Sequence, residues 1–326
     1  MADNGPELSW QEFRALAEAG GLTAGIVETH IGIDEANTEG FDPRLVFSPQ
    51  LAKTPSSGVA SEEIVATLEL DDAIKGGTFV TTSARGIGNR LKIAVEGDSW
   101  FHLPPFIYPT DIVDVLRRMF DVNSTAKWAD TLEEMVSEKQ YLQVLGGGQR
   151  RHFLVSAGGN DVVGSIGSYV DRFRTGDDDA QDASSYIKSS FRPRVKELIA
   201  LFRTMADEIA QLDVPPVTMY VHGYANVIPI PKGPYVGLRL EQLGFDPARH
   251  PDLTAAIVEE LVEIFNEELA AFARASGGRV IYIDLRDEMG PGDWHKDELH
   301  PNGNAATRLA AVFAKRIRRG DIPALS

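Results

Sequence analysis

The stretch Leu91–Trp100, LKIAVEGDSW, joins a short apolar run to a glycine, an acid and a serine. Three further short apolar runs follow it, at Phe153–Val155, Val217–Val221 and Val280–Ile283. Helical patterns separate these runs, which predicts βαβ units and a parallel, doubly wound sheet. Sites in such sheets form beyond the carboxyl ends of the strands. The residues directly after each run are therefore the first candidates for a functional site.

The helices between the strands are predicted from apolar residues that recur on one face. In the helix expected at about 254–275, residues such as Ile257, Leu261 and Leu269 share one face, and Gly277 marks the end of the helix. The expected helices lie at about 110–119, 130–145, 184–212 and 254–275, with a last one from about 304.

The N-terminal part of the chain differs in character. Ser9–Glu12 has the pattern of a capping box, which predicts a short helix that Gly20 and Gly21 end. Short strands are expected at Ile64–Leu70 and Thr78–Thr82. Residues 1–88 are therefore predicted to be an acidic accessory region, followed by a main α/β domain over 89–326.

Four polar side chains stand where the predicted strands end or near the C-terminus. Ser99 follows the first run, Asn160 follows the second, and Asp297 and His300 follow the last. A serine becomes a nucleophile when a histidine accepts its proton, and an aspartate orients that histidine. An asparagine amide and a backbone N–H can stabilise the oxyanion that forms. The set predicts a serine hydrolase.

These residues lie in three blocks, Gly97-Asp98-Ser99, Gly158-Gly159-Asn160-Asp161 and Asp297-x-x-His300-Pro301. In these blocks the sequence resembles the SGNH (GDSL-like) hydrolase family, over about residues 91–319. The resemblance implies a flavodoxin-like three-layer α/β/α sandwich with a parallel sheet, here with an N-terminal extension. It also implies Ser99 as nucleophile, His300 as base, Asp297 as its orienter and Asn160 as an oxyanion donor.

One block of the family departs from its usual form. The family places a glycine there, whose backbone N–H completes the oxyanion hole together with the N–H of the nucleophile. In this sequence Ala129 takes that place, within Asn123–Thr131. Only a backbone N–H is required, so alanine can serve at negative φ, whereas a positive φ would disfavour it. The predicted oxyanion hole is formed by Ser99, Ala129 and Asn160.

Aromatic residues stand next to each block. Trp100, Trp128 and Trp294 either pack in the core or line an apolar acyl pocket. His222 follows the third strand at the same edge and either touches the substrate or satisfies a loop. These four are the predicted substrate-binding residues.

Metal and nucleotide sites are not expected. His295, Glu298 and His300 lack the spacing of a zinc-binding helix, and Asp177–Asp182 lacks the glycine and final glutamate of a calcium loop. The glycines fit neither a Rossmann fingerprint nor a phosphate-binding loop. No metal and no cofactor are therefore predicted.

Composition limits the partners. The 326 residues carry a formal charge of −16 and a pI near 4.9, which argues against nucleic acid and anionic membranes as partners. The chain has no cysteine, so disulfides, thiolate metal sites and cysteine nucleophiles are excluded. No apolar run is long enough to span a membrane, and the first residues do not resemble a secretory signal. A cytoplasmic location is expected, and the sequence leaves the oligomeric state open.

The predicted activity is hydrolysis of a small carboxylic ester through an acyl-Ser99 intermediate. An acyltransferase would use the same nucleophile with an alcohol or sugar in place of water. A third reading is an inactive hydrolase-fold binding or scaffold protein, which the alanine at position 129 and the acidic region 1–88 motivate.

Overall fold

The structure is a computed structural model, and it describes residues 8–22, 24–33, 45–47, 59–60, 63–64, 67, 70, 90–103, 110–178, 181–295 and 297–320. The chain divides into two compact units. The first comprises Met1–Arg90 and Leu103–Thr110, and the second comprises Leu91–His102 and Asp111–Ser326. The predicted boundary near residue 88 stays a prediction, and the segment from Leu103 to Thr110 is grouped with the first unit.

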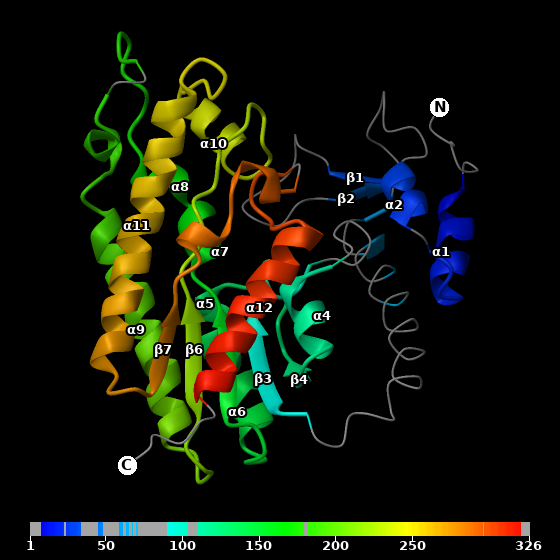
Figure 1. Cartoon of the computed structure of the whole chain (residues 1–326). Helices are drawn as coiled ribbons and strands as arrows, with labels where there is room; N and C mark the ends of the chain where they lie inside the picture. The colour runs from blue at the N-terminus through cyan, green and yellow to red at the C-terminus, as the bar shows by residue number, and fades with distance from the viewer. Residues whose placement is uncertain are drawn as a thin grey trace. The chain divides into compact units, whose positions relative to one another are not determined.

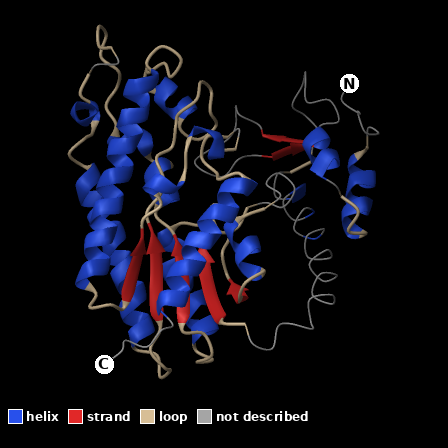
Figure 2. Ribbon diagram, in the orientation of Figure 1, coloured by secondary structure: helices blue, strands red, loops and turns tan. Residues whose placement is uncertain are grey.

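The second unit is built on a five-stranded parallel sheet (Figures 1 and 2). Its strand order is β4-β3-β5-β6-β7. The strands are β3 (Lys92–Gly97), β4 (Asp121–Ser124), β5 (His152–Ser156), β6 (Thr218–His222) and β7 (Val280–Ile283). The four predicted apolar runs became β3, β5, β6 and β7, because apolar, β-branched residues fill strands that are covered on both faces.

Helices cover both faces of this sheet. The β3–α4–β4 crossover runs along the sheet in one direction and the later crossovers run in the other, so right-handed connections put their helices on opposite faces. Helix α12 packs on α4, whereas α9 packs on α5, α6 and α11 (Figure 1). The predicted three-layer α/β/α fold is confirmed. The helices are α4 (Ile112–Arg117), α5 (Leu132–Glu138), α6 (Gln140–Leu145), α9 (Phe191–Ala210), α11 (Pro251–Ala275) and α12 (Gly303–Gly320).

Strands β3 and β5 are neighbours, but the chain leaves them in opposite directions. From β3 it passes to β4 at the edge, and from β5 it passes to β6 on the other side. Such a reversal of strand order opens a crevice beyond the carboxyl ends of the two strands. The fold therefore presents the residues after Gly97 and after Ser156 at one place.

Three details differ from the sequence-based expectations. The helix expected at 130–145 is two helices, α5 and α6, because Lys139 adopts a left-handed conformation with φ of 54°. The helix expected at 184–212 begins only at Phe191, after the 3-10 turn Ala183–Tyr186. Strand β4 was not predicted, since its residues are polar and partly exposed.

The shorter elements of the second unit are α7 (Gly159–Val163), α8 (Ile166–Tyr169), α10 (Gly237–Gln242), η3 (Arg286–Glu288) and η4 (Pro291–Asp293).

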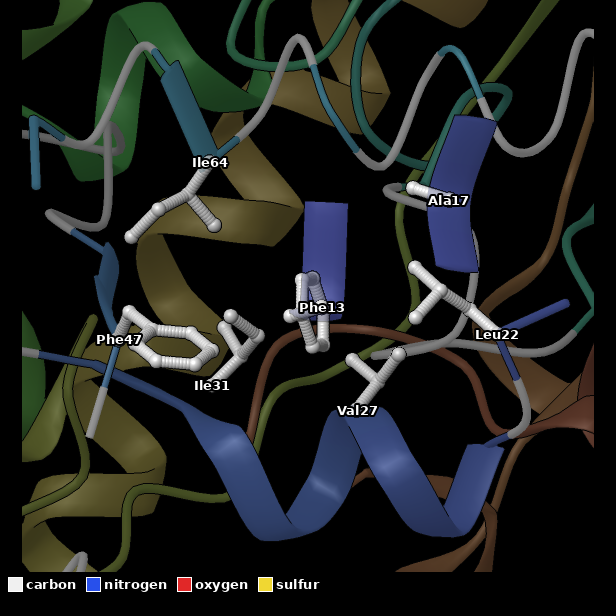
Figure 3. Packing of buried hydrophobic residues seen from close by; sticks show 7 residues of the cluster. All are labelled: Phe13, Ala17, Leu22, Val27, Ile31, Phe47 and Ile64. Atoms are coloured by element: carbon white, nitrogen blue, oxygen red, sulfur yellow. The ribbon is translucent and has the colours of Figure 1, made fainter. Parts of the chain in front are cut away.

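The first unit contains helices α1 (Trp10–Glu18) and α2 (Ala24–His30) and the antiparallel pair β1 (Ile31–Ile33) and β2 (Leu45–Phe47). Ser9 and Glu12 form the predicted capping box, and Gly20 follows the helix with φ of 64°. A small apolar core holds these elements together (Figure 3). It consists of Phe13, Ala17, Leu22, Val27, Ile31, Phe47 and Ile64.

The strand expected at Ile64–Leu70 is wrong for the residues that are described there. Ile64, Thr67 and Leu70 are helical, and the Thr67 hydroxyl donates to the carbonyl of Glu63, four residues earlier. Positions 64, 67 and 70 have the three-residue spacing of a helix, and Ile64 and Thr67 are buried whereas Leu70 is exposed. The strand expected at Thr78–Thr82 lies outside the described residues.

Within the described part of the chain, no helix combines the length and the apolar character that crossing a bilayer requires.

Candidate active site

Ser99, His300 and Asp297 form a continuous hydrogen-bonded chain. The Nε2 atom of His300 lies 2.8 Å from the Oγ atom of Ser99, and its Nδ1 atom lies 2.8 Å from Oδ2 of Asp297. The other carboxylate oxygen of Asp297 accepts the backbone N–H groups of Leu299 and His300, each at 3.1 Å. All three side chains are buried. The carboxylate is thus fixed by the backbone of the segment that carries the histidine.

Two aromatic rings hold the imidazole of His300. The indole of Trp128 stacks on it, with centroids 5.2 Å apart and an interplanar angle of 30°. Tyr235 contacts it edge-on at 5.3 Å and 87°. The ring orientation therefore depends on residues from two other loops, besides Asp297.

Asn160 lies in the first turn of α7, directly after β5. Gly158 caps this helix with φ of 94°, a conformation that glycine adopts without strain. The Nδ2 atom of Asn160 donates to the main-chain carbonyl of Asp130 at 2.8 Å. This bond joins the end of β5 to the segment that follows β4. It leaves the second N–H of the amide for another acceptor.

Ala129 stands in that segment with φ of 61°. The segment is tied to β3 by two backbone bonds, from Thr125 N–H to the Val95 carbonyl at 2.8 Å and from Lys127 N–H to the Gly97 carbonyl at 2.9 Å. Glycine adopts a positive φ without strain, whereas alanine is strained there by roughly 1–2 kcal/mol. The alanine thus keeps a glycine-like backbone conformation at a cost in energy.

Asp98 is the centre of a second buried network. Its Oδ1 accepts the hydroxyl of Ser156 at 2.6 Å, and its Oδ2 accepts the hydroxyl of Tyr224 at 2.5 Å. The Tyr224 oxygen in turn accepts the N–H of Gly159 at 3.2 Å. Burial raises the pKa of Asp98 to about 6, although these hydrogen bonds lower it. The network connects the residue before Ser99 with the residue before Asn160.

Two further carboxyl groups are perturbed beside the site. Burial raises the pKa of Glu96 to about 7, while its bond with the Thr125 hydroxyl, 2.5 Å long, opposes that shift. Burial likewise raises the pKa of Asp130 to about 6, and the charge of Lys127 opposes it. Burial thus favours the neutral form of both carboxyl groups.

The predicted substrate-binding residues fall into two groups. Trp100 and His222 are buried and stack on each other at 5.6 Å, and burial lowers the pKa of His222 to about 4, so the ring is neutral at pH 7. Trp128 and Trp294 are only partly buried, and Trp294 meets Trp100 edge-on at 6.3 Å. Contact of these residues with a substrate stays a prediction.

Within the described residues, no group of three or more histidine and acidic side chains is arranged to hold a metal ion.

Sequence reasoning missed three residues at this site, Tyr224, Tyr235 and Glu298. The sequence offers no motif for Tyr235, and Glu298 is visible in it only beside the two histidines His295 and His300. Tyrosine just after a strand end was the one available signal for Tyr224, because it stands at the edge where the site forms.

No protein-family model matches the chain, and no curated protein matches it in sequence. Solved structures that it is similar to include a lipase from a goat rumen metagenome, at 12% identity, covering 69% of this chain and 96% of that one, with a TM-score of 0.49. An extracellular lipase from Streptomyces rimosus is 14% identical over 69% and 99% of the chains, with a TM-score of 0.46. A lipase/acylhydrolase from Enterococcus faecalis is 20% identical over 70% and 96%, with a TM-score of 0.40.

The chain has the three-layer α/β/α architecture with a parallel sheet that its sequence predicted. The architecture and the chemistry of this chain are argued from its own residues.

Proposed function

We propose that the chain is a serine esterase of the SGNH type, which hydrolyses a small carboxylic ester through an acyl-Ser99 intermediate. The observation that carries the proposal is the chain of short contacts from the Ser99 hydroxyl through His300 to Asp297. It lies beyond the carboxyl end of β3, at the reversal of strand order. A hydroxyl, an imidazole and a carboxylate in this order form the arrangement that activates a serine.

In acylation, the Ser99 oxygen attacks the ester carbonyl while Nε2 of His300 accepts the hydroxyl proton. The imidazolium that forms donates through Nδ1 to Asp297, whose charge stabilises it. His300 then gives the proton to the leaving alkoxide as the C–O bond of the ester breaks. An alcohol departs and the acyl group stays on Ser99.

The developing oxyanion requires donors, and three are proposed. They are the backbone N–H of Ser99, the backbone N–H of Ala129 and the second N–H of the Asn160 amide. The bond from Asn160 to the Asp130 carbonyl fixes the plane of that amide. Loss of one such donor lowers turnover by about 10²- to 10³-fold.

Deacylation repeats these steps with water. His300 accepts a proton from water as the water oxygen attacks the acyl carbonyl, and it returns that proton to Oγ of Ser99 as the bond between Oγ and the acyl carbon breaks. Ser99 and the carboxylic acid are released. The proposal places the activity in residues 89–326 and treats 1–88 as an accessory region.

A phosphonate ester that mimics the tetrahedral intermediate tests the nucleophile. Incubation with such a probe, followed by intact-mass analysis, should add one phosphonyl group to the wild type and none to Ser99→Ala. Ser168→Ala, a change at an exposed serine of the same unit, should be labelled like the wild type. Labelling of Ser99→Ala, or no labelling of the wild type, would contradict the proposal.

A further inference from the structure

Glu298 lies between Asp297 and His300 in the chain, and its side chain is buried. Its backbone has φ of 65°, in the left-handed region that a glutamate rarely adopts. Its N–H donates to the carbonyl of His295 at 3.1 Å, while the His295 N–H donates to the carbonyl of His300 at 2.8 Å. These bonds close a tight loop that turns the glutamate away from the triad.

The Glu298 carboxylate is held by backbone N–H groups of the loop after β6. Oε2 accepts the N–H of Ile230 at 2.7 Å, and Oε1 accepts those of Val236 at 2.7 Å and Gly237 at 2.9 Å. Burial raises the pKa of Glu298, and the same N–H groups oppose that rise. The loop from 230 to 237 thus wraps around a single buried carboxyl group.

The fit of this loop around the carboxyl group is close. A Cβ atom placed on Gly233 would lie 2.2 Å from the carboxyl carbon and oxygens of Glu298. No side chain fits there while the three N–H bonds persist. The loop therefore follows the glutamate at van der Waals distance as well as through hydrogen bonds.

The same loop delivers Tyr235 to the edge of the His300 ring, at 5.3 Å and 87°. Tyr235 directly precedes Val236, one of the residues whose N–H binds the carboxylate. The position of the ring is therefore coupled to the carboxylate through one peptide unit. Aromatic edge-to-face contacts of this kind are attractive and favour one mutual orientation of the rings.

We infer that Glu298 is a positioning residue of the active site, which docks the loop 230–237 against the Asp297–His300 segment so that Tyr235 fixes the imidazole of His300. The inference rests on the proposed function, because it assigns His300 as the base. Glu298 itself touches neither the substrate nor the reacting atoms.

A carboxylate is the side chain that this loop requires. It offers two oxygens that only accept hydrogen bonds, whereas a glutamine of the same size replaces one oxygen by an NH₂ donor. In Glu298→Gln the NH₂ group of the glutamine would face at least one of the backbone N–H groups that bind the carboxylate, so that two donors would meet. At least one buried backbone N–H then loses its partner, and the loop moves.

The first test compares Glu298→Gln with Glu288→Gln, which makes the same change at an exposed glutamate of η3. End-point titration with the phosphonate probe counts the folded sites, and ester hydrolysis is then expressed per site. We expect Glu298→Gln to lose roughly 10- to 100-fold in kcat, since small misplacements of a catalytic group have effects of this size. KM should change far less, because the base acts in the chemical step.

The second test disrupts the contact between Glu298 and the loop 230–237 by a substitution in the loop. Gly233→Ala forces the carboxyl group and the loop apart, whereas Gly167→Ala adds a methyl group where nothing lies within 4 Å. Gly233→Ala should reproduce the kcat loss of Glu298→Gln, and Gly167→Ala should behave like the wild type. If Glu298→Gln yields no folded sites, the comparison of Gly233→Ala with Gly167→Ala decides whether the contact between Glu298 and the loop affects kcat.

A double-mutant cycle tests whether the effect passes through Tyr235. Tyr235→Leu should lower kcat, and adding Glu298→Gln to it should lower kcat little further, because both changes remove one and the same constraint. Fully additive losses would overturn the route through Tyr235. Wild-type kcat per site in both Glu298→Gln and Gly233→Ala would overturn the inference. A wild type that neither binds the probe nor hydrolyses esters would refute the proposed function instead.

Discussion

His300 and Ser99 are 201 residues apart in the sequence, yet Nε2 of one lies 2.8 Å from Oγ of the other. Ser99 is placed by β3 and His300 by the segment that leads into α12. Helix α12 packs on α4, which follows β3 in the chain. The packing of α12 on α4 therefore helps to hold the segments that carry Ser99 and His300 together.

The carboxylate of Asp297 is expected to contribute through the tautomer and charge of His300. Asp297→Asn keeps the size of the side chain and removes its charge, so kcat should fall by roughly 10⁴-fold while the fold persists. Asp287→Asn, at an exposed position of η3, is the control. Steady-state hydrolysis and circular dichroism check both points. Near-normal turnover of Asp297→Asn would remove this residue from the mechanism.

Tyr224 and Tyr282 carry buried hydroxyl groups near the ends of the neighbouring strands β6 and β7. We expect removal of these two hydroxyl groups to have opposite effects on stability. The Tyr224 hydroxyl joins Asp98 to Gly159, whereas the buried hydroxyl of Tyr282 has no hydrogen-bond partner among the described residues. Tyr224→Phe should lower the free energy of unfolding by about 1–3 kcal/mol, because buried partners lose their bonds. It should also lower kcat, since Asp98 precedes Ser99, the proposed nucleophile.

Tyr282→Phe removes an unsatisfied hydroxyl and should leave stability unchanged or raise it. Urea unfolding of the two variants measures the contrast. Equal destabilisation by both changes would show that ring packing, and not the Asp98 network, explains the role of Tyr224.

Glu96 should make stability depend on pH in a defined window. Its pKa is raised from 4.5 to about 7 in the folded state, so the native protein binds more protons than the unfolded chain between these values. Stability contributed by this group therefore falls as pH rises from 4.5 to about 7 and is constant above that.

Glu96→Gln removes the titration. Relative to the wild type, its free energy of unfolding should rise across the same window and then level off. Glu267→Gln, an exposed change on α11, should show no such trend. Urea melts at several pH values measure the difference. A difference that is flat or declines with pH would contradict the buried state of this carboxyl group.

The backbone conformation of Ala129 predicts that a glycine substitution there stabilises the protein, whereas glycine substitutions usually destabilise it. With φ of 61°, Ala129→Gly should relieve strain and raise stability by up to about 1 kcal/mol, with activity retained because the N–H remains. Ala126→Gly, in the same segment, should instead lower stability by about 0.5–1 kcal/mol through the entropy of the unfolded chain. Thermal unfolding distinguishes the two. Destabilisation by both would argue against the left-handed backbone at Ala129.

The sequence was sufficient to predict the sheet core and the four polar residues at its edge. Ser99 and Asn160 follow buried apolar runs, and in a parallel sheet this alone brings them to one edge. Strand β4 was missed because Asp121–Ser124 lies at the edge of the sheet, where partial exposure permits polar residues.

The supporting contacts could not be predicted in the same way. The Glu298 carboxylate is bound by backbone N–H groups of the loop 230–237. The directions of these groups depend on the path of the loop and leave no pattern in side-chain types. The left-handed residues Lys139 and Glu298 carry side chains that normally avoid that region, so local preferences argued against the turns that form there.

The most direct test of the central claim is hydrolysis of p-nitrophenyl esters, from acetate to decanoate, by the wild type, Ser99→Ala and Ser168→Ala. The account predicts turnover by the wild type and by Ser168→Ala, and a loss of roughly 10⁵- to 10⁶-fold in Ser99→Ala. The chain-length preference of the wild type would then give the size of the acyl group that it accepts. Equal turnover by Ser99→Ala and the wild type would contradict the account.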